Sequence, residues 1–233
     1  MTKNERETTA GFQEAARVQT SFTAPIERRI LPWIAARLPS WINSDHLTLL
    51  GFLAMAAAGA SYALVRWSRV GLILATVCLF LNWLGDSLDG TLARVRHQLR
   101  PRYGFYVDHV IDTLGAFFLM GGLAASGLIL PRIAAGMLIA YLMLSAEVYL
   151  ATHSLGKFRL SFGKFGPTEI RILLGSANTA LWLRGDAPVF GDAYQLFNLG
   201  GSIAIAGMFL MLIVSIIRNA HQLYCEETLM PKR

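Results

Sequence analysis

The sequence predicts an all-α integral membrane protein with six transmembrane helices, preceded by an N-terminal amphipathic interfacial helix. Hydrophobic residues make up 54% of the 233-residue chain and charged residues only 15%, whereas a soluble domain carries about 25% charged residues. The apolar residues form several runs of roughly 20, the length that an α-helix needs to cross a bilayer. Most Lys and Arg residues lie in every second connection between these runs, as is typical of polytopic membrane proteins.

The first part of the chain is polar. Residues 1–20 predict a flexible N-terminus, and residues 21–43 predict an amphipathic segment that lies in the membrane interface. In that segment apolar side chains recur at helical spacing while the arginines lie off the stripe, which consists of Ile26, Ile30, Trp33, Ile34 and Leu38. Three prolines predict that the segment is broken into short pieces, because proline removes a backbone donor and crowds the preceding turn. They are Pro25, Pro32 and Pro39.

Hydropathy then predicts a six-helix transmembrane domain over residues 44–222, followed by a cytosolic tail at 223–233. The expected spans are 46–67, 70–92, 104–127, 131–154, 167–184 and 194–220. The fifth run is the weakest of the six, because it is short and contains both Glu169 and Arg171.

The distribution of positive charge predicts the orientation of these spans. With the N-terminus in the cytosol, 17 of the 21 Lys and Arg residues fall on the cytosolic side, which is the arrangement that the positive-inside rule favours. Both termini are therefore expected in the cytosol. The net charge of +6 follows from this rule and from attraction to the headgroups of membrane lipids, so we expect no nucleic-acid partner.

Four aspartates lie at the cytosolic ends of the second and third spans. Asp86 and Asp89 are three residues apart, so they share one face of a helix. Asp108 and Asp112 follow Gly104 at intervals of four residues and share a face of the next helix. Because a short connection joins the two spans, the helices must be antiparallel neighbours whose acidic faces can meet.

Converging carboxylates at the edge of the hydrocarbon repel each other and are costly to desolvate, and divalent cations remove both problems. All-oxygen ligation suits Mg2+ or Mn2+, which commonly bridge carboxylates to substrate phosphates. Gly90, Ala93 and Gly104 lie beside the aspartates and leave room for a bulky phosphorylated group. The pattern predicts a site for phosphate chemistry that holds one or two metal ions at the cytosolic face.

Together the two aspartate runs form a single pattern over 27 residues: Asp86-x-x-Asp89-Gly90-x-x-Ala93-Arg94, nine residues, then Gly104-x-x-x-Asp108-x-x-x-Asp112. This pattern resembles the signature of the CDP-alcohol phosphotransferases, integral membrane enzymes that make phospholipids. The six-span layout with cytosolic termini and an N-terminal interfacial helix is also similar to that family.

The resemblance implies a role for each position of the pattern. Asp86, Asp89, Asp108 and Asp112 would ligate two Mg2+ or Mn2+ ions, and Asp112 would also be the general base that takes the proton from the acceptor hydroxyl. Gly90, Ala93 and Arg94 would line the CDP moiety. The chain would then be a metal-dependent enzyme in which an acceptor alcohol attacks the β-phosphorus of a CDP-alcohol and CMP leaves.

Upstream, the stretch WINSDHLTLLG resembles the segment that precedes the first span in the same family. Asp45 and Thr48 match the polar positions of that segment and are implied nucleotide contacts, while Ser44 stands where the family commonly has proline. Helix capping is the alternative explanation of Asp45 and Thr48.

The acceptor is expected to contact polar residues elsewhere in the spans and in the loop that precedes the fifth span. Glu147 is an intramembrane carboxylate, which indicates either substrate contact or pairing with another span. A helix that begins at Pro167 would offer free amide groups to an anion. The candidate acceptor-binding residues are Glu147, Lys157, Arg159, Lys164, Glu169 and Arg171.

Several alternatives stay open at this point. CDP-diacylglycerol is the preferred donor, with CDP-choline or CDP-ethanolamine transfer to diacylglycerol as the second choice. Intramembrane prenyl transfer also uses aspartates with Mg2+, and an ion-coupled transporter also uses intramembrane acids. The resemblance implies a homodimer, and the small residues Gly200, Ala204 and Gly207 on one face of the last span would permit close helix packing.

Overall fold

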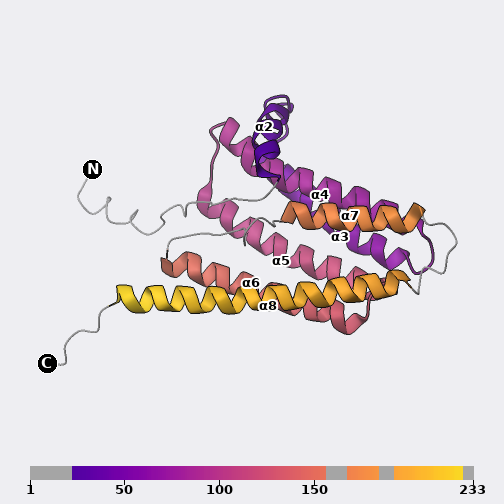
Figure 1. The fold of residues 1–233 in the computed structure, drawn as a ribbon. Coiled ribbons are helices and arrows are strands. Elements are labelled where there is room, and N and C mark those ends of the chain that lie inside the picture. Colours follow the sequence, from indigo (N-terminus) through magenta and orange to yellow (C-terminus); the bar gives the residue numbers. More distant parts are fainter. Residues whose placement is uncertain (1–22, 156–166, 184–191, 228–233) are drawn as a thin grey trace, which may run out of the picture.

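We analysed a computed structural model that describes residues 23–155, 167–183 and 192–227. Within these ranges the chain is helical, with no strand. The helices are α2 (Ala24–Ala35), α3 (Ser44–Leu64), α4 (Val70–Val95), α5 (Pro101–Ser126), α6 (Pro131–Leu155), α7 (Pro167–Leu183) and α8 (Asp192–Glu226) (Figure 1). Each of the six predicted apolar runs therefore forms a helix.

Local sequence accounts for where several helices begin and end. Asn43 caps α3 by accepting a hydrogen bond from the His46 amide at 2.9 Å, and the His46 ring accepts from the Asn43 amide in return. Pro101 and Pro131 occupy first positions, where the missing amide hydrogen is not needed. The α5 helix ends at Gly127, whose φ of 79° lies in the left-handed region that glycine adopts without strain.

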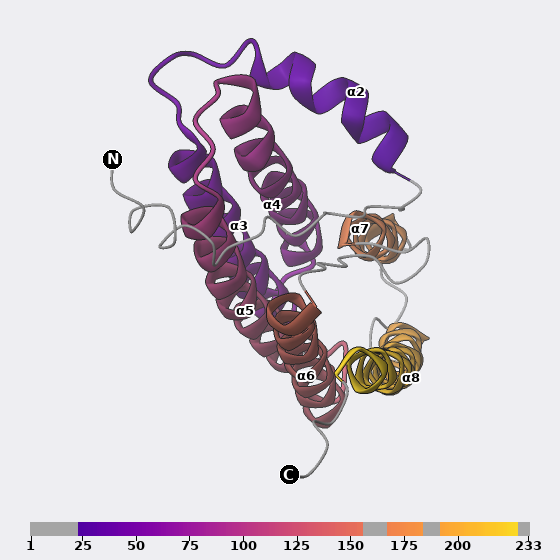
Figure 2. The same cartoon turned by 90° about the vertical axis from the view of Figure 1, so that its left-hand side faces the viewer.

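Helix α3 lies between α4 and α5 and approaches each of them very closely, whereas α4 and α5 are not an extensively packed pair (Figure 2). The prediction that α4 and α5 are direct neighbours is therefore wrong, because α3 packs between them. A Cβ atom on Gly122 of α5 would lie 1.9 Å from the carbonyl oxygen of Gly59 on α3. A Cβ atom on Gly85 of α4 would lie 2.6 Å from the carbonyl oxygen of Leu47 on α3. Only glycine fits at these crossings, so backbone contacts fix the positions of the two helices that carry the aspartates.

The remaining three helices complete an open ring around a central space. Helix α6 packs on α5, α8 packs on α6, and α7 packs on α4 from the other direction. Among the described helices, α7 and α8 are not an extensively packed pair, and they stand apart in Figure 2. The ring is therefore closed on the side of α3 and open between α7 and α8.

A buried polar cluster holds α7 in place. The Asn178 amide group of α7 donates to the Tyr62 hydroxyl of α3 at 2.9 Å and to the Thr76 hydroxyl of α4 at 3.3 Å. Asn178 and Tyr62 have no solvent exposure. Polar groups buried in an apolar interior need such partners, so this cluster determines the register of α7 against α3 and α4.

Helix α2 packs on α4 (Figure 1). It lies across the end of the bundle that the sequence predicts to be cytosolic. Its Leu31 and Ala35 are buried against the bundle, while Ile26, Ile30 and Trp33 are exposed. The prediction that Pro32 breaks this segment is wrong. The helix runs through Pro32 and closes with a hydrogen bond from the Ala36 amide to the Pro32 carbonyl, because a proline close to the end of a helix removes few of its bonds.

The starts of α2 and α7 are joined by reciprocal hydrogen bonds. Glu169 of α7 accepts from the backbone amide and the hydroxyl of Thr23, each at 3.0 Å. Glu27 of α2 accepts from the Thr168 hydroxyl at 2.8 Å and from the Trp83 indole of α4 at 3.2 Å. Each carboxylate thus lies near the N-terminus of the other helix, where the helix dipole favours negative charge.

Five of the helices are long and apolar enough to cross a membrane, namely α3, α4, α5, α6 and α8. Helix α7 has 17 residues, which corresponds to roughly 26 Å at 1.5 Å per residue. It is slightly shorter than the hydrocarbon core of about 30 Å. The protein is therefore a multi-pass membrane protein with at least these five candidate spans.

Candidate active site

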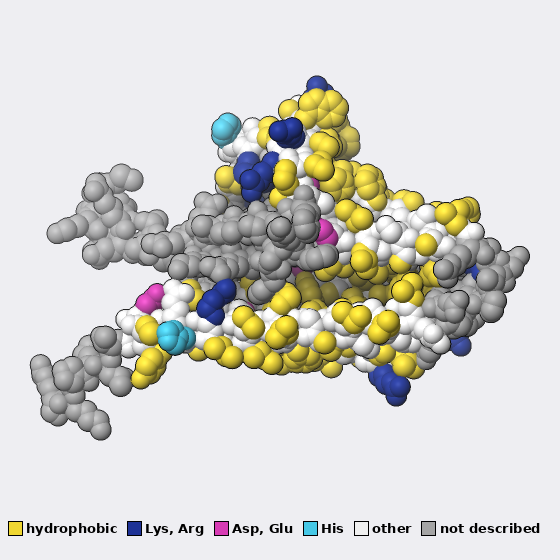
Figure 3. Space-filling model, viewed as in Figure 1, with side chains coloured by type: hydrophobic (Ala, Val, Ile, Leu, Met, Phe, Trp, Pro, Cys, Tyr) yellow, Lys and Arg dark blue, Asp and Glu magenta, His cyan; other side chains and the backbone are white. Residues whose placement is uncertain are grey.

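The central space of the open ring is a cavity of about 1970 Å³. All of the helices from α3 to α8 contribute residues to its wall. The space-filling view shows the molecule hollowed between α7 and α8, with apolar side chains along both edges and acidic side chains within (Figure 3).

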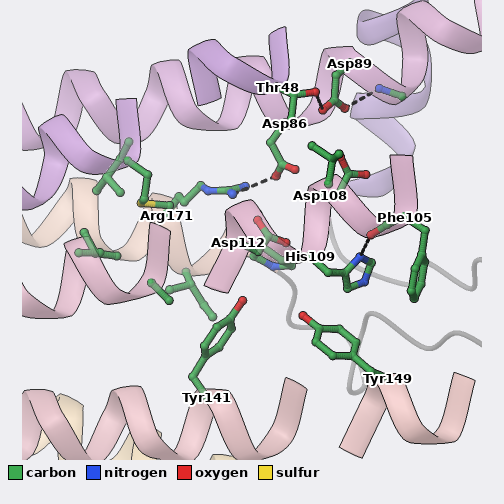
Figure 4. A pocket seen from close by; sticks show the side chains of 18 of the residues that line it. Thr48, Asp86, Asp89, Phe105, Asp108, His109, Asp112, Tyr141, Tyr149 and Arg171 are labelled. Carbon is green, nitrogen blue, oxygen red and sulfur yellow. Dashed lines mark hydrogen bonds and ion pairs between the residues drawn. The ribbon is translucent and has the colours of Figure 1, made fainter. Parts of the chain in front are cut away.

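The four predicted metal ligands all line this cavity. Asp86 and Asp89 project from α4, and Asp108 and Asp112 project from the facing side of α5 (Figure 4). Asp89 is buried, with 8% of its surface exposed, whereas Asp86 and Asp112 are exposed to the cavity. All four side chains that the spacing predicted to share one site thus line the same cavity.

Asp89 is held in a fixed orientation by its neighbours. The Thr48 hydroxyl of α3 donates to its carboxylate at 2.8 Å, and the Gly90 amide donates to the other carboxylate oxygen. The Ser44 hydroxyl donates to the Asp89 backbone carbonyl at 2.8 Å. Helix α3 thus positions Asp89 through two residues of the stretch that resembles the family's upstream segment.

Asp86 is paired with a cation from across the cavity. Its carboxylate accepts a hydrogen bond from the Arg171 guanidinium of α7 at 2.9 Å. Arg171, predicted from the sequence as a candidate acceptor contact, therefore lies beside the aspartates rather than in a separate site. Its position depends on α7, which the Asn178 cluster anchors two turns farther along the helix.

The donor set suits a hard divalent cation, because four carboxylates supply only oxygen ligands. Within the described ranges, however, no three acidic, histidine or cysteine side chains are gathered closely enough to hold an ion as they stand. The carboxylates line one wall of the cavity, and those of α4 and α5 would have to draw together around an ion. The donor set therefore fits a divalent metal by chemistry and by location.

Space beside the carboxylates is left open. Gly90 and Gly104 line the cavity together with Ala93, and a Cβ atom on either glycine would meet nothing within 4 Å. These glycines therefore differ from those at the helix crossings, which are filled by neighbouring backbone. Arg94 also lines the cavity on this side, so the region predicted to take the CDP moiety combines free volume with positive charge.

Asp45, a predicted nucleotide contact, lines the cavity and is ion-paired with Arg100 at 2.6 Å. The hydrogen bond to Asp45 raises the pKa of Arg100 above its ordinary value. Arg100 precedes α5 and also lies over the Tyr103 ring, 4.4 Å from its centroid. The ion pair joins the start of α3 to the turn before α5 at the mouth of the cavity, and the sequence reasoning did not anticipate it.

Two other acceptor candidates make helix-to-helix contacts instead of lining the cavity. The Glu147 carboxylate of α6 accepts from the Ser215 hydroxyl at 2.8 Å and from the Asn219 amide at 2.7 Å, both on α8. This is the pairing alternative that the sequence left open. Glu169 contacts Thr23 of α2. Lys157, Arg159 and Lys164 lie outside the described residues.

The wall opposite the carboxylates carries two tyrosines that the sequence reasoning missed. Tyr141 and Tyr149 of α6 line the cavity, and their hydroxyl groups point toward α5 (Figure 4). They are eight residues apart, so they share one face of the helix. The sequence signal that could have identified them is a pair of polar side chains on one face of an otherwise apolar span.

Away from the aspartates the cavity becomes apolar. Its wall there consists of α7 residues such as Leu173 and Leu174 and α8 residues such as Leu196 and Ile203. Gly200 and Gly207 also line this part, and a Cβ atom on either would meet nothing within 4 Å. The small residues of the last span therefore border the cavity, whereas the sequence suggested that they serve helix packing.

The fold and the cavity define a polytopic α-helical membrane protein with a site where two facing helices present carboxylates to an internal space. The family model of the CDP-alcohol phosphatidyltransferases matches residues 41–217, which include α3 to α7 and most of α8. The chain belongs to this family. Members of this family are transferases of phosphate-containing groups in phospholipid biosynthesis.

Two curated relatives share part of the sequence. The archaetidylinositol phosphate synthase of Methanothermobacter thermautotrophicus is 32% identical over 129 residues, which cover 53% of this chain and 62% of that protein. The archaetidylinositol phosphate synthase of Pyrococcus horikoshii is 35% identical over 88 residues, which cover 38% of this chain and 44% of that protein. Each match thus spans less than two thirds of the relative's length.

Proposed function

We propose that this protein transfers the phosphatidyl group of a lipid CDP-alcohol, CDP-diacylglycerol or its ether-lipid counterpart, to the hydroxyl group of a phosphorylated polyol, with release of CMP. The observation that carries the proposal is one continuous cavity. Its acidic end suits a diphosphate and its metal ions, and its apolar end between α7 and α8 suits lipid chains.

The chemical step follows from the position of Asp112. In the proposed reaction the acceptor oxygen attacks the β-phosphorus, and the bond from that phosphorus to the oxygen bridging to the α-phosphorus breaks. CMP leaves with that oxygen, and the proton of the acceptor hydroxyl passes to the Asp112 carboxylate. Asp112 suits this role because it is exposed and lines the cavity beside the other aspartates, where the β-phosphate would lie.

Asp86, Asp89 and Asp108, together with Asp112, would hold two Mg2+ or Mn2+ ions. Such ions, when bound, neutralise the diphosphate and polarise the phosphoryl oxygens. The four carboxylates carry a charge of −4, so two divalent cations balance them. Before a metal binds, hydrogen bonds already orient the Asp89 carboxylate. Asp86 would have to break its ion pair with Arg171 in order to bind the metal. The guanidinium released in this way would lie beside the bound phosphates.

The apolar end of the cavity suits the chains of a lipid substrate, which is the donor in CDP-diacylglycerol transfer and the acceptor in CDP-choline or CDP-ethanolamine transfer. The choice of a lipid donor therefore rests on the relatives. The gap in the ring between α7 and α8 would admit those chains directly from the bilayer. The names of the two relatives support a lipid donor and an inositol phosphate acceptor.

The arrangement in the membrane is part of the proposal. We place both termini and the aspartates on the cytosolic side, count α7 as a sixth span, and place α2 in the interface with Ile26, Ile30 and Trp33 toward lipid. Residues 44–222 would form the catalytic domain. A homodimer is expected from the family resemblance.

The test measures CMP release by the purified full-length protein in detergent. CDP-diacylglycerol is combined with inositol phosphate, glycerol phosphate, inositol or serine, and CDP-choline and CDP-ethanolamine are combined with diacylglycerol, each with Mg2+, with Mn2+ or with a chelator. We expect CMP release only with CDP-diacylglycerol, a phosphorylated polyol and a divalent metal. Asp112→Asn should lower kcat by about 10²- to 10⁴-fold, because a positioned general base contributes that much.

Glu226→Gln, which changes an exposed acid of α8 in the same way, is the matched control and should retain full activity. Turnover of CDP-choline with diacylglycerol in place of the lipid donor would refute the donor assignment. Retention of activity in Asp112→Asn would refute the role of Asp112 as the base.

A further inference from the structure

Three polar side chains form a stripe along the inner face of α6. Tyr141, Ser145 and Tyr149 follow each other at intervals of four residues, so they lie on one face of the helix. Tyr141 and Tyr149 both line the cavity, so the stripe presents two phenol hydroxyls to the same space.

This stripe lies directly across the cavity from the general base. Figure 4 shows the hydroxyls of Tyr141 and Tyr149 directed toward Asp112 and His109 of α5. The Tyr149 ring packs edge-on against the His109 ring at 4.7 Å between centroids. This contact places Tyr149 beside the α5 turn that carries Asp108 and Asp112.

The chemistry of the stripe suits neutral hydroxyl groups better than phosphate. A phenol both donates and accepts a hydrogen bond, as does an alcohol. The described residues of α6 that line the cavity include no Lys or Arg, so an anion beside the tyrosines would face the carboxylates of α4 and α5. Arg171, which pairs with Asp86, comes from α7.

From this placement we infer that Tyr141 and Tyr149 form the binding site for the hydroxyl groups of a polyhydroxylated acceptor. Their hydroxyls would hold the hydroxyls that neighbour the reacting one, so that the reacting oxygen faces Asp112. This inference rests on the proposed function and names the residues that select the acceptor. A site built to hydrogen-bond a substrate hydroxyl discriminates strongly against analogues that lack it.

The test compares Tyr141→Phe and Tyr149→Phe with the wild type in the CMP-release assay, with KM measured separately for CDP-diacylglycerol and for inositol phosphate. We expect the KM for inositol phosphate to rise about three- to tenfold in each variant, the effect of one lost neutral hydrogen bond. The KM for the donor should stay unchanged. Tyr106→Phe, at an exposed tyrosine of α5, is the matched control and should change neither value.

Monodeoxy analogues of the acceptor make the assignment more specific. One analogue lacks the hydroxyl that the tyrosine contacts, and with it the wild type and the phenylalanine variant should have similar KM values. The same hydrogen bond is missing in both cases, so the substitution adds little to the effect of the missing hydroxyl. CMP release by the wild type tests the proposed function itself. With that release intact, an unchanged KM for inositol phosphate in both variants would overturn the tyrosine site alone.

If a phenylalanine variant fails to fold, the inference is tested by the turnover of the monodeoxy acceptors by the wild type. If the wild type then turns over every monodeoxy acceptor as efficiently as the parent compound, no ring hydroxyl is recognised and the inference is wrong. Discrimination against at least one monodeoxy acceptor by tenfold or more would support it.

Discussion

The two sides of the cavity are held together in different ways. Helix α3 touches α4 and α5 backbone to backbone, and glycines such as Gly59 and Gly122 make this close approach possible. Helix α8, by contrast, packs extensively on α6 alone among the described helices. That pair is joined by side chains, including the hydrogen bonds from Ser215 and Asn219 to Glu147.

The proposed function gives this difference a meaning. The carboxylates lie on helices that backbone contacts with α3 hold in place, so the proposed metal ligands would be on the rigid side. The tyrosines and α8 lie on the loosely packed side, where the proposed substrates would enter and leave.

Substituting matched glycines tests this contrast most strongly. Gly122→Ala places a methyl group against the Gly59 carbonyl, so we expect a loss of roughly 3 kcal/mol or more of stability and the loss of activity. Gly207→Ala adds the same methyl group where no atom lies within 4 Å, and it should leave the unfolding temperature unchanged. Thermal unfolding in detergent measures both. Equal destabilisation by the two substitutions would show that the two sides are packed alike.

The buried cluster at Asn178 tests how α7 is held to the rigid side. Asn178→Ala leaves the Tyr62 and Thr76 hydroxyls without their partner, which costs roughly 1–3 kcal/mol. Activity should fall as well, since α7 positions Arg171 beside Asp86. Thr179→Ala on the same helix removes an exposed hydroxyl and is the control. If unfolding temperature and activity are both retained in Asn178→Ala, the cluster does not position α7.

The smallest effect is expected on the loosely packed side. Glu147→Ala removes the acceptor for Ser215 and Asn219 and should destabilise the protein by roughly 1 kcal/mol, the usual strength of polar contacts between membrane helices. Gln222→Ala on α8 is the control, because its hydrogen bond to Glu226 is exposed and local. Thermal unfolding compares the two variants. A loss as large as that in Asn178→Ala would contradict the ranking proposed for the two sides.

The elements that could be predicted from the sequence were those that depend on local periodicity. The spacing of Asp86, Asp89, Asp108 and Asp112 places each pair on one helix face, and all four side chains line the same cavity. The short connection did not reveal that α3 packs between α4 and α5. Apolar runs likewise predicted each helix of the bundle, since length and composition decide whether a segment can cross a bilayer.

Contacts between distant segments could not be predicted in this way. Nothing local indicates that Glu169 would meet Thr23 or that Arg171 would meet Asp86, because both contacts depend on where α7 docks. The glycines of the last span illustrate the same limit. Small residues on one helix face fit either a close crossing or the wall of a cavity, and the neighbouring helices decide between the two.

The gap between α7 and α8 determines which measure of concentration would govern the binding of each substrate. A donor that enters through this gap comes from the plane of the bilayer, so its effective concentration is its mole fraction among the surrounding lipids. CMP and a polar acceptor exchange with water and are governed by ordinary volume concentration. Diluting CDP-diacylglycerol with inert detergent at constant bulk concentration should therefore slow the reaction, while the same dilution leaves the acceptor dependence unchanged. The enzyme would respond to the composition of the membrane as well as to the supply of soluble metabolites.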